Sequence, residues 1–256
     1  ALYELTRRLS AAHIDYEVCS ADEARKLEPG LASNINLASA LYLPAAWSGN
    51  GRLFSQGLLQ ALQAHGLQLH TQQIVQRIDS QAHGAALHVE GATLTFDAVV
   101  LCTGSHTARM LQPFNIKLPA AAIHSYSVSI QITEHSLAPR HSIVDLENGM
   151  LLTRQGSRLR ISGGAELGFT ESPERTDEAH HQLMSLLLEW FPGSIVRSQS
   201  ATQIWRGTRM TAPDGLPVLG ASGAPHIWLN TAHGGYGWGL AMGCAHHLRQ
   251  LINEQP

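Results

Sequence analysis

The stretch that decides the fold runs from Trp205 to Ile252 and reads WRGTRMTAPDGLPVLGASGAPHIWLNTAHGGYGWGLAMGCAHHLRQLI. A short apolar segment, Ile227 to Leu229, is followed by a cluster of glycines at 234, 235 and 237. Beyond the glycines, apolar residues recur at helical spacing, which predicts a helix with one buried stripe. The stripe consists of Leu240, Cys244, Leu248, Leu251 and Ile252. We therefore expect a strand, a glycine turn and a helix.

A strand, a glycine turn and a helix N-terminus together can form a backbone site for an anion. The first N–H groups of the helix lack an intrahelical partner, and the helix dipole favours negative charge. Gly239, Ala241, Gly243 and Ala245 would let the helix approach a flat group closely. The alternative is a closely packed C-terminal helix without a ligand, and the spacing alone leaves both open.

The same stretch resembles the C-terminal signature of the flavin-dependent amine and amino-acid oxidoreductases, the D-amino-acid oxidase superfamily. Within it, the likeness is strongest to the bacterial D-amino-acid dehydrogenases. The shared pattern is Trp, Gly and Arg before Pro-Asp-Gly, then Pro and Gly, then a His-Gly loop that opens the last helix. It is carried here by Trp205, Gly207, Arg209, Pro213, Asp214, Gly215, Pro217, Gly220, His233, Gly234, Gly237 and Trp238.

The resemblance implies an α/β plus α+β fold with FAD as the cofactor. An FAD-binding Rossmann-like domain would be interleaved with an antiparallel-sheet substrate domain of the D-amino-acid oxidase type. Residues 1–50 would form a linker and the start of the substrate domain, and residues 113–204 the rest of that domain. The FAD-binding domain would comprise residues 51–112 and 205–256.

One expected motif is absent from the chain. FAD proteins of this superfamily begin with a strand, a G-x-G-x-x-G turn and a helix that cradle the pyrophosphate, and residues 1–256 contain no such unit. By resemblance, the chain corresponds to the middle and end of a longer oxidoreductase, so we expect an incomplete FAD-binding domain. The strand at 97–101 should then lack a neighbour and expose an apolar edge. A partner chain could supply the missing unit.

The amino-acid composition excludes some classes of binding partner. The 256 residues are 44% hydrophobic and 14% charged, with a net charge of −3, which argues against nucleic acid. No apolar run approaches the ~18 residues of a membrane-spanning helix, and no signal peptide is visible. Peripheral contact with an inner membrane stays open.

Cysteine and histidine usage points to neither disulfides nor metal. Cys19, Cys102 and Cys244 are far apart, without a CxxC pair, so we expect buried reduced thiols in a cytoplasmic protein. The histidine pairs 180–181 and 246–247 are adjacent, and adjacent helical residues point in different directions. No metal site is predicted.

The first part of the FAD-binding domain should contain a helix and several strands. A helix is expected over 52–66, with Phe54, Leu58, Ala61 and Leu62 inside. Strand candidates lie at 67–70, 74–78, 86–89 and 93–96. The apolar run that starts at Asp97 predicts a strand buried on both faces. Thr103 and Gly104 follow it, at the carboxyl end where open α/β sheets bind ligands.

The predicted substrate domain reads as a sheet and one helix. Alternation from Tyr126 to Ile132 predicts a half-buried strand, and further strands are expected at 141–146, 150–154 and 158–162. Ser172 and Pro173 should begin a helix, with Ser172 as N-cap. Its core stripe would be Leu183, Leu186, Leu187 and Trp190. Near the N-terminus, Ser20 and Glu23 form a capping box.

The resemblance assigns the catalytic roles to Arg209, Tyr126 and His233. Arg209 would hold the substrate carboxylate, for which a guanidinium fork is well suited; alternatively it pairs with Asp214 and braces the turn. His233 would lie beside the flavin ring or anchor its loop. Tyr126 would line the substrate pocket or simply pack, and His124 replaces a basic residue that the family usually carries just before it.

The resemblance also implies a set of cofactor contacts. Amides of the glycine loop would lie near the flavin and favour negative charge on the reduced ring. The family has glycine before the loop histidine, whereas this chain has Ala232, so the loop geometry can differ. The implied contacts are Val75, Thr103, Gly104, Gly207, His233, Gly234, Gly235, Tyr236 and Gly237.

The implied activity is oxidative deamination of a small amino acid, with a D-amino acid expected, to the keto acid and ammonia. Hydride would pass from the substrate Cα to flavin N5. The electron acceptor would be a quinone or oxygen, which the sequence does not distinguish. Alternatives are a glycine or sarcosine-type amine oxidase, an oxidoreductase domain acting on tRNA wobble uridine, and a truncated chain that is inactive without its dinucleotide-binding N-terminus.

Overall fold

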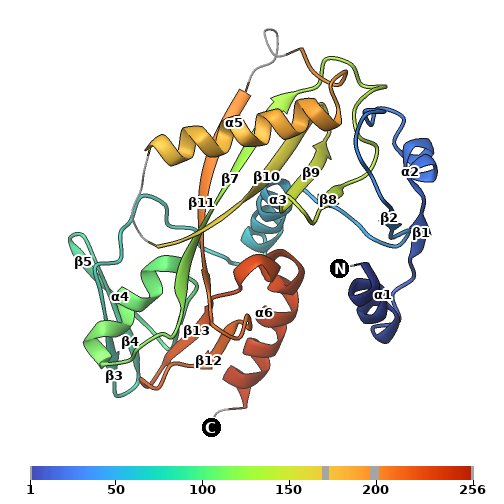
Figure 1. Ribbon diagram of the computed structural model, residues 1–256. Helices are drawn as coiled ribbons and strands as arrows, with labels where there is room; N and C mark the ends of the chain where they lie inside the picture. Colours follow the sequence, from blue (N-terminus) through green and yellow to red (C-terminus); the bar gives the residue numbers. More distant parts are fainter. Residues whose placement is uncertain (1, 169–172, 197–201, 255–256) are drawn as a thin grey trace. The chain divides into compact units, whose positions relative to one another are not determined.

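Figure 1 shows the computed structural model of residues 1–256, of which residues 2–168, 173–196 and 202–254 are described. The chain forms two compact units. Unit 1 comprises Ala1–Asn50, Ser125–Gly164 and Glu171–Arg206, and unit 2 comprises Gly51–His124, Ala165–Thr170 and Gly207–Pro256. The units are defined by contacts rather than by function, so the domain boundaries expected from the sequence stay a prediction.

Each unit contains both helices and strands, and unit 2 also contains short 3₁₀ turns. Unit 1 contains α1 (Leu2–Ala11), β1 (Glu17–Cys19), α2 (Ala21–Leu27), β2 (Ala40–Tyr42), β8 (Ile143–Asp145), β9 (Met150–Gln155) and α5 (Pro173–Trp190). Unit 2 contains α3 (Gly51–Gln63), β3 (Arg77–Gln81), β4 (Gly84–Val89), β5 (Ala92–Phe96), β6 (Val99–Leu101), η1 (Gly104–His106), α4 (Thr107–Leu111), η2 (Gln112–Phe114), β12 (Val218–Ala221), β13 (Ile227–Thr231), η3 (Gly234–Tyr236) and α6 (Gly237–Asn253). Strands β7 (Ala121–Gln131), β10 (Arg158–Leu167) and β11 (Thr202–Thr211) contribute residues to both units.

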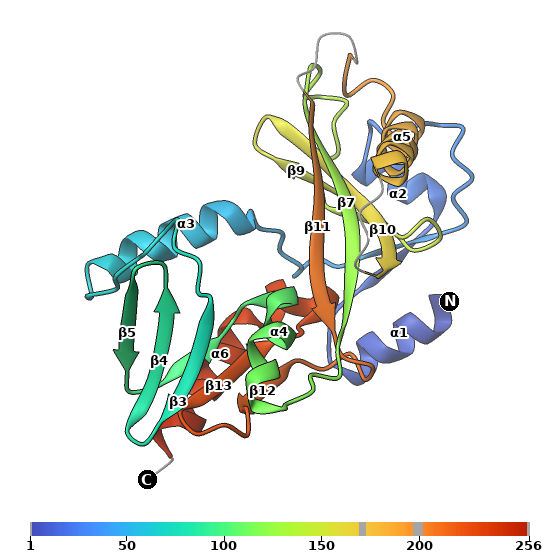
Figure 2. The same cartoon turned by 90° about the vertical axis from the view of Figure 1, so that its left-hand side faces the viewer.

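The core of unit 1 lies between a sheet and one helix. The sheet has the order β11-β7-β10-β9-β8, and α5 runs across one of its faces (Figures 1 and 2). Val128, Ile161 and Leu152 of three neighbouring strands are fully buried in the same cluster as Leu187 of α5. Period-two alternation places these side chains on one face of the sheet. The predicted strands and helix of this region are confirmed.

Two predictions for the helices of unit 1 are confirmed: the capping box of α2 and the apolar stripe of α5. Ser20 accepts from the Glu23 N–H and Glu23 from the Ser20 N–H, which confirms the capping box of α2. In α5, Leu183 and Leu187 are buried while Leu186 and Trp190 are partly buried. The predicted N-cap, Ser172, lies outside the described residues.

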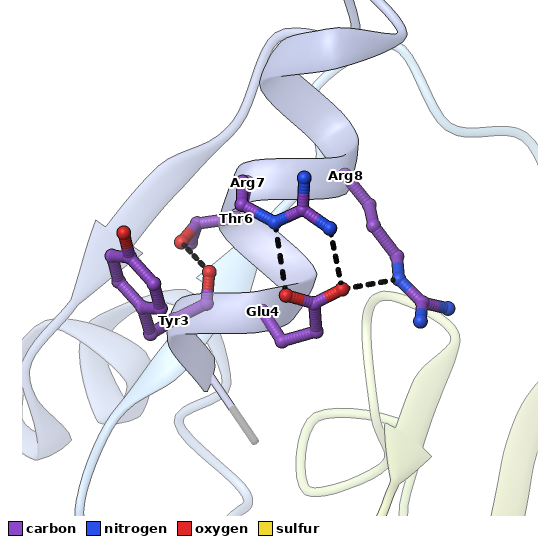
Figure 3. Close-up of polar contacts among 5 residues, drawn as sticks. All are labelled: Tyr3, Glu4, Thr6, Arg7 and Arg8. Atoms are coloured by element: carbon purple, nitrogen blue, oxygen red, sulfur yellow. Dashed lines mark hydrogen bonds and ion pairs between the residues drawn. The ribbon is translucent and has the colours of Figure 1, made fainter.

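Helix α1 is held by its own side chains rather than by burial, because none of its residues is buried. Glu4 accepts from Arg7 at 2.8 and 2.9 Å and from Arg8 at 2.9 Å (Figure 3). These hydrogen bonds lower the pKa of Glu4 to about 2. The spacings i,i+3 and i,i+4 are those at which opposite charges meet on a helix surface.

Unit 2 contains two small sheets and a shared core. Strands β3, β4 and β5 form an antiparallel sheet, visible as a separate layer in Figure 2. The second sheet has the order β12-β13-β6, in which β6 and β13 are parallel. Ile78, Leu101, Leu111 and Ile227 lie in one buried cluster. As predicted, β6 lies at a sheet edge among the described strands.

Five expectations for unit 2 and the cysteines are wrong. β3 begins at Arg77 instead of Ile74, and residues 67–70 form no strand. Strand β6 is not buried on both faces, since Val100 between its buried neighbours is 39% exposed. Helix α3 buries no residue, and the Phe54 ring of its apolar stripe lies edge-on to Trp238 of α6 while staying exposed. Cys102 is exposed, since it follows the last buried residue of β6.

A buried histidine on α5 has no hydrogen-bond partner. His180 is 6% exposed, its ring lies edge-on to Tyr126, and neither ring nitrogen bonds to another described residue. Burial lowers the pKa of His180 below its ordinary value; Asp177 acts against this shift and His181 adds to it. The imidazole is therefore neutral at pH 7.

This burial predicts acid-sensitive stability. Because the folded pKa lies below the unfolded value of ~6.5, stability should fall as pH decreases from 6.5 through the folded pKa. The variant His180→Phe fills a similar volume and has no ring nitrogens that lack a hydrogen-bond partner. Its melting temperature should decrease less than that of the wild type when the pH is lowered from 7.5 to 5.5. The exposed neighbour His181→Gln is the control. Equal acid sensitivity of wild type and His180→Phe would contradict the prediction.

Candidate functional site

The parallel pairing of β6 and β13 brings two strand ends together. Leu101 pairs with Leu229, so the residues that follow each strand emerge at the same edge of the sheet. Thr103 and Gly104 follow β6, and Ala232 and His233 follow β13. Open α/β sheets bind ligands at such carboxyl ends. Two of the predicted site segments are thereby adjacent in unit 2.

The β6 end carries a row of hydroxyl groups. Thr107 Oγ1 lies 3.0 Å from Thr103 Oγ1 and 3.3 Å from Thr231 Oγ1. Thr107 is fully buried and Thr231 is 2% exposed, whereas Thr103 is exposed. The sequence pointed to Thr103 but missed the other two. The i,i+4 spacing of Thr103 and Thr107 at a helix start was the available signal.

The loop after β13 has an unusual backbone. Ala232 and Gly234 both have left-handed φ angles, 57° and 56°. A Cβ at Gly234 would lie 3.0 Å from Thr211 Oγ1, so both backbone and space require glycine there. Thr211 and His233 form an isolated antiparallel bridge. This bridge ties the loop to the end of β11.

The loop leads into helix α6 without a side-chain cap. Tyr236 is the N-cap residue, and its side chain caps no backbone group of the helix. Gly235 and Tyr236 are exposed, and Tyr236 is 71% accessible. The first N–H groups of a helix need an acceptor from outside it. The start of α6 thus has no side-chain acceptor from its N-cap residue, and the Tyr236 N–H donates to the His233 carbonyl at 3.2 Å.

His233 is partly buried at the start of this loop. Burial lowers the pKa of His233, so its imidazole is neutral at pH 7. The ring forms no hydrogen bond with the described residues around it. The loop is anchored through the backbone bridge to Thr211 instead.

Arg209 projects from β11 two residues before Thr211. It is exposed, and no ion pair joins it to Asp214, whose carboxylate instead accepts from the Leu216 N–H at 3.0 Å. The sequence alternative of a turn-bracing Arg209–Asp214 pair is therefore not formed. The guanidinium keeps its fork of donors available.

A buried histidine fixes the strand beside Arg209. His124 Nε2 donates to the Gly168 carbonyl, and Nδ1 lies 2.7 Å from Thr208 Oγ1. Since a carbonyl only accepts, Nε2 of His124 carries a hydrogen, and Nδ1 and the Thr208 hydroxyl share the second hydrogen bond. Neighbouring strand residues point to opposite faces. Arg209 therefore projects away from the face that His124 holds.

The remaining predicted residues lie apart from this arrangement or at its margin. Tyr126 belongs to unit 1 and is 2% exposed against His180, so a contact with substrate would require it to leave that packing. Val75 lies just before β3, packed on the buried cluster of unit 2. Gly207 is half-buried in β11. The structure thus brings together the strand ends, the glycine loop and the Arg209 segment.

Other site types find no support in the described chain. A cavity of about 380 Å³ lies between β3 and α4, with Arg77 and Arg109 among its lining residues, and shares none of the predicted site residues. Within residues 2–168, 173–196 and 202–254, no group of three or more His, Cys, Asp or Glu residues could hold a metal ion. In the same part of the chain, no helix has the length and hydropathy needed to cross a membrane.

Comparison with known proteins matches nearly the whole chain to one family. Residues 1–251 match the family described as FAD dependent oxidoreductase, DAO. The chain is 31% identical over 243 residues to the D-amino acid dehydrogenase of Vibrio vulnificus, strains YJ016 and CMCP6. That alignment covers 94% of this chain and 57% of the relative, so the chain spans little more than half the length of these curated relatives.

Solved structures share the fold. Glycine oxidase from Geobacillus kaustophilus superimposes with a TM-score of 0.85 at 21% identity, covering 100% of this chain and 67% of that one. Iminodiacetate oxidase from Chelativorans sp. BNC1 gives 0.80 at 18% identity, covering 98% and 67%. These similarities establish the mixed fold expected from the sequence.

Ala232 offers a test of the loop geometry. Ala232→Gly should change stability by no more than about 1 kcal/mol, because relief of left-handed strain offsets the lost methyl burial and the added chain entropy. Ala232→Val should cost about 2 kcal/mol or more, since a β-branched residue is strained at positive φ. Melting temperatures would show this, with Ala121→Val on β7 as the matched control. A fully tolerated Ala232→Val would contradict the loop conformation.

Proposed function

The chain belongs to the DAO family of FAD-dependent oxidoreductases, and from that premise we propose that it is the substrate-recognising and C-terminal part of an amino-acid-oxidising flavoenzyme. The proposed reaction is oxidative deamination of a small D-amino acid to the keto acid and ammonia. Its support is the likeness to the Vibrio dehydrogenase together with the site at the β6 and β13 ends.

The residues present fit part of an FAD site. The strands β6 and β13 are parallel, helix α6 begins without a side-chain cap, and Gly104 has a left-handed φ of 53°. Asn230 Oδ1, next to the end of β13, is buried without a partner among the described residues. We propose that Val75, Thr103, Gly104, Gly207 and the segment His233–Gly237 contact FAD. When bound, FAD would supply the hydride-accepting ring.

We propose that Arg209 holds the substrate carboxylate. The observation that carries this role is that its guanidinium is exposed and not paired with Asp214, on the strand that is bridged to the glycine loop. A planar fork binds a carboxylate with two parallel charged hydrogen bonds. Fixing the carboxylate in this way would orient the substrate Cα–H.

We propose that His233 contributes as a neutral group. Its lowered pKa means that it adds no positive charge to the loop at pH 7. Negative charge near the loop would then be stabilised by backbone amides. For Tyr126, the pocket role predicted from the sequence is kept as a proposal, with the packing against His180 as its competing explanation.

Two alternatives have specific support. The fold likeness to glycine oxidase favours a glycine or sarcosine-type amine oxidase, in which oxygen rather than a quinone accepts the electrons. A chain that is inactive by itself is favoured by the absent G-x-G-x-x-G motif and by the edge position of β6 among the described strands of its sheet. A partner chain with a dinucleotide-binding unit would then restore activity. Peripheral membrane contact would accompany a quinone acceptor.

Arg209→Gln in the flavin-loaded holoenzyme should lower kcat/KM for amino acids at least about 100-fold, mainly through KM. Two charged hydrogen bonds of about 1.5–3 kcal/mol each would be lost, while flavin content stays unchanged. Arg249→Gln, at an exposed position of α6, is the matched control. Loss of flavin from the Arg209 variant would instead identify Arg209 as a cofactor or structural residue.

The visible absorption spectrum of the purified chain, after addition of FAD and removal of the excess, tests the proposed function directly. Retained flavin bands that bleach with D-alanine, and not with L-alanine, would support an enzyme that is active as the 256-residue chain. Bands that bleach only with glycine or sarcosine would favour the amine oxidase. If no flavin is retained, adding a separately expressed dinucleotide-binding unit from a relative should restore it; failure of that as well would refute the proposal.

A further inference from the structure

A buried hydroxyl row joins the ends of β6 and β13, and it has a direction. Thr231 is the last residue of β13, Thr107 the first of α4, and Thr103 follows β6. Their Oγ1 atoms are separated by 3.3 Å and 3.0 Å in that order. Exposure rises along the row, from the two buried threonines to the exposed Thr103.

Each hydroxyl has one hydrogen to donate, so Thr107 cannot donate to both neighbours and three orientations remain. If Thr103 and Thr231 both donated to Thr107, the hydrogen of the fully buried Thr107 would have no acceptor among the described residues. If Thr103 donated inward to Thr107 and Thr107 to Thr231, the Thr231 hydrogen would need a further acceptor. Thr231 is 2% exposed, and Thr107 is the one hydrogen-bond partner of its side chain among the described residues. A buried donor without an acceptor costs about 1–3 kcal/mol. The inward orientation is therefore disfavoured.

In the outward orientation every buried hydrogen is used. Thr231 donates to Thr107, Thr107 donates to Thr103, and the Thr103 hydrogen points away from the protein interior. Thr107 is fully buried, so no solvent contact competes for its hydroxyl. The row then presents one hydroxyl donor at the carboxyl end of β6.

We propose that Thr107 and Thr231 are positioning residues that make Thr103 a hydrogen-bond donor to an acceptor oxygen of the bound cofactor. This inference rests on the proposed function, in which Thr103 contacts FAD. The oxygen would be a phosphate, ribityl or carbonyl oxygen, because each accepts and none of them requires the Thr103 hydroxyl to accept. A threonine without the row could point its hydrogen either way and would be less ordered.

The first experiment compares FAD dissociation constants of the holoenzyme, measured by flavin fluorescence. Thr107→Val keeps the shape but removes the hydroxyl, and it should raise the Kd for FAD about 3- to 10-fold, the range expected for one net hydrogen bond. Thr107→Ser, which restores the hydroxyl, should bind FAD like the wild type. Thr95→Val, at an exposed position of β5, is the control. An unchanged Kd in Thr107→Val, or a serine variant as weak as the valine variant, would overturn the proposal.

A thermal unfolding cycle tests, without FAD, whether the Thr107 and Thr231 hydroxyls are coupled. Thr107→Val leaves the Thr231 hydroxyl buried and unpaired, so its melting temperature should fall. Thr231→Val, added to Thr107→Val, removes that orphan and should recover part of the loss, giving strong non-additivity. Strictly additive effects of the two substitutions would show that the Thr107 and Thr231 hydroxyls are not coupled and would overturn the proposed row. If the double valine variant does not fold, the Kd for FAD is compared between Thr107→Ser and Thr231→Val. Thr107→Ser should bind FAD like the wild type, and Thr231→Val, which removes one hydroxyl of the row, should bind it more weakly.

Failure of the proposed function gives a different result from failure of this inference. If the wild-type protein bound no FAD, the cofactor role of Thr103 would be refuted, while the unfolding cycle would still test the hydroxyl row. Wild-type FAD binding with no difference among the threonine variants would leave the proposed function intact and refute only the inference.

Discussion

The parallel pairing of β6 and β13 is the constraint on which the candidate site depends. Val99, Leu101, Ile227 and Leu229 bury the pair in one apolar cluster, and the register places Leu101 against Leu229. A slip of one residue would turn these side chains to the other face and separate the strand ends. The hydrophobic pattern thus fixes where the Thr103 segment and the glycine loop meet, before any polar contact forms.

Hydrogen bonds between side chains then orient the site residues at this pair of strands and on β11. The hydroxyl of Thr107 links the two strand ends, and His124 holds Thr208 so that Arg209 projects from the opposite face of β11. His124, Thr107 and Thr231 are buried, where an unpaired polar group would be costly. Their net contribution to stability is modest, but they select one arrangement among those that the apolar core alone would tolerate.

Sequence reasoning succeeded where the signal was local and failed where it required a partner. The strand, glycine loop and helix at 227–253 and the capping box at Ser20 follow from periodicity and from contacts within a few residues. The apolar face of α3 was correctly periodic, but periodicity cannot say what covers it. Thr231 was missed because its partner is 124 positions away in the chain. The pocket role of Tyr126 stays a prediction, since alternation gives two faces without saying which one is buried against a helix.

Ala232 shows why the loop is best understood as formed in advance of any ligand. A non-glycine residue at φ 57° costs about 1–2 kcal/mol, and the family pattern places glycine there. The alanine methyl is buried with Ala122 and Met210, which returns about 0.8 kcal/mol, and the Thr211–His233 bridge holds the backbone on either side. Packing and bridge together offset most of the strain. A loop whose conformation is already set loses little entropy when an anionic group meets its amides, and this favours binding.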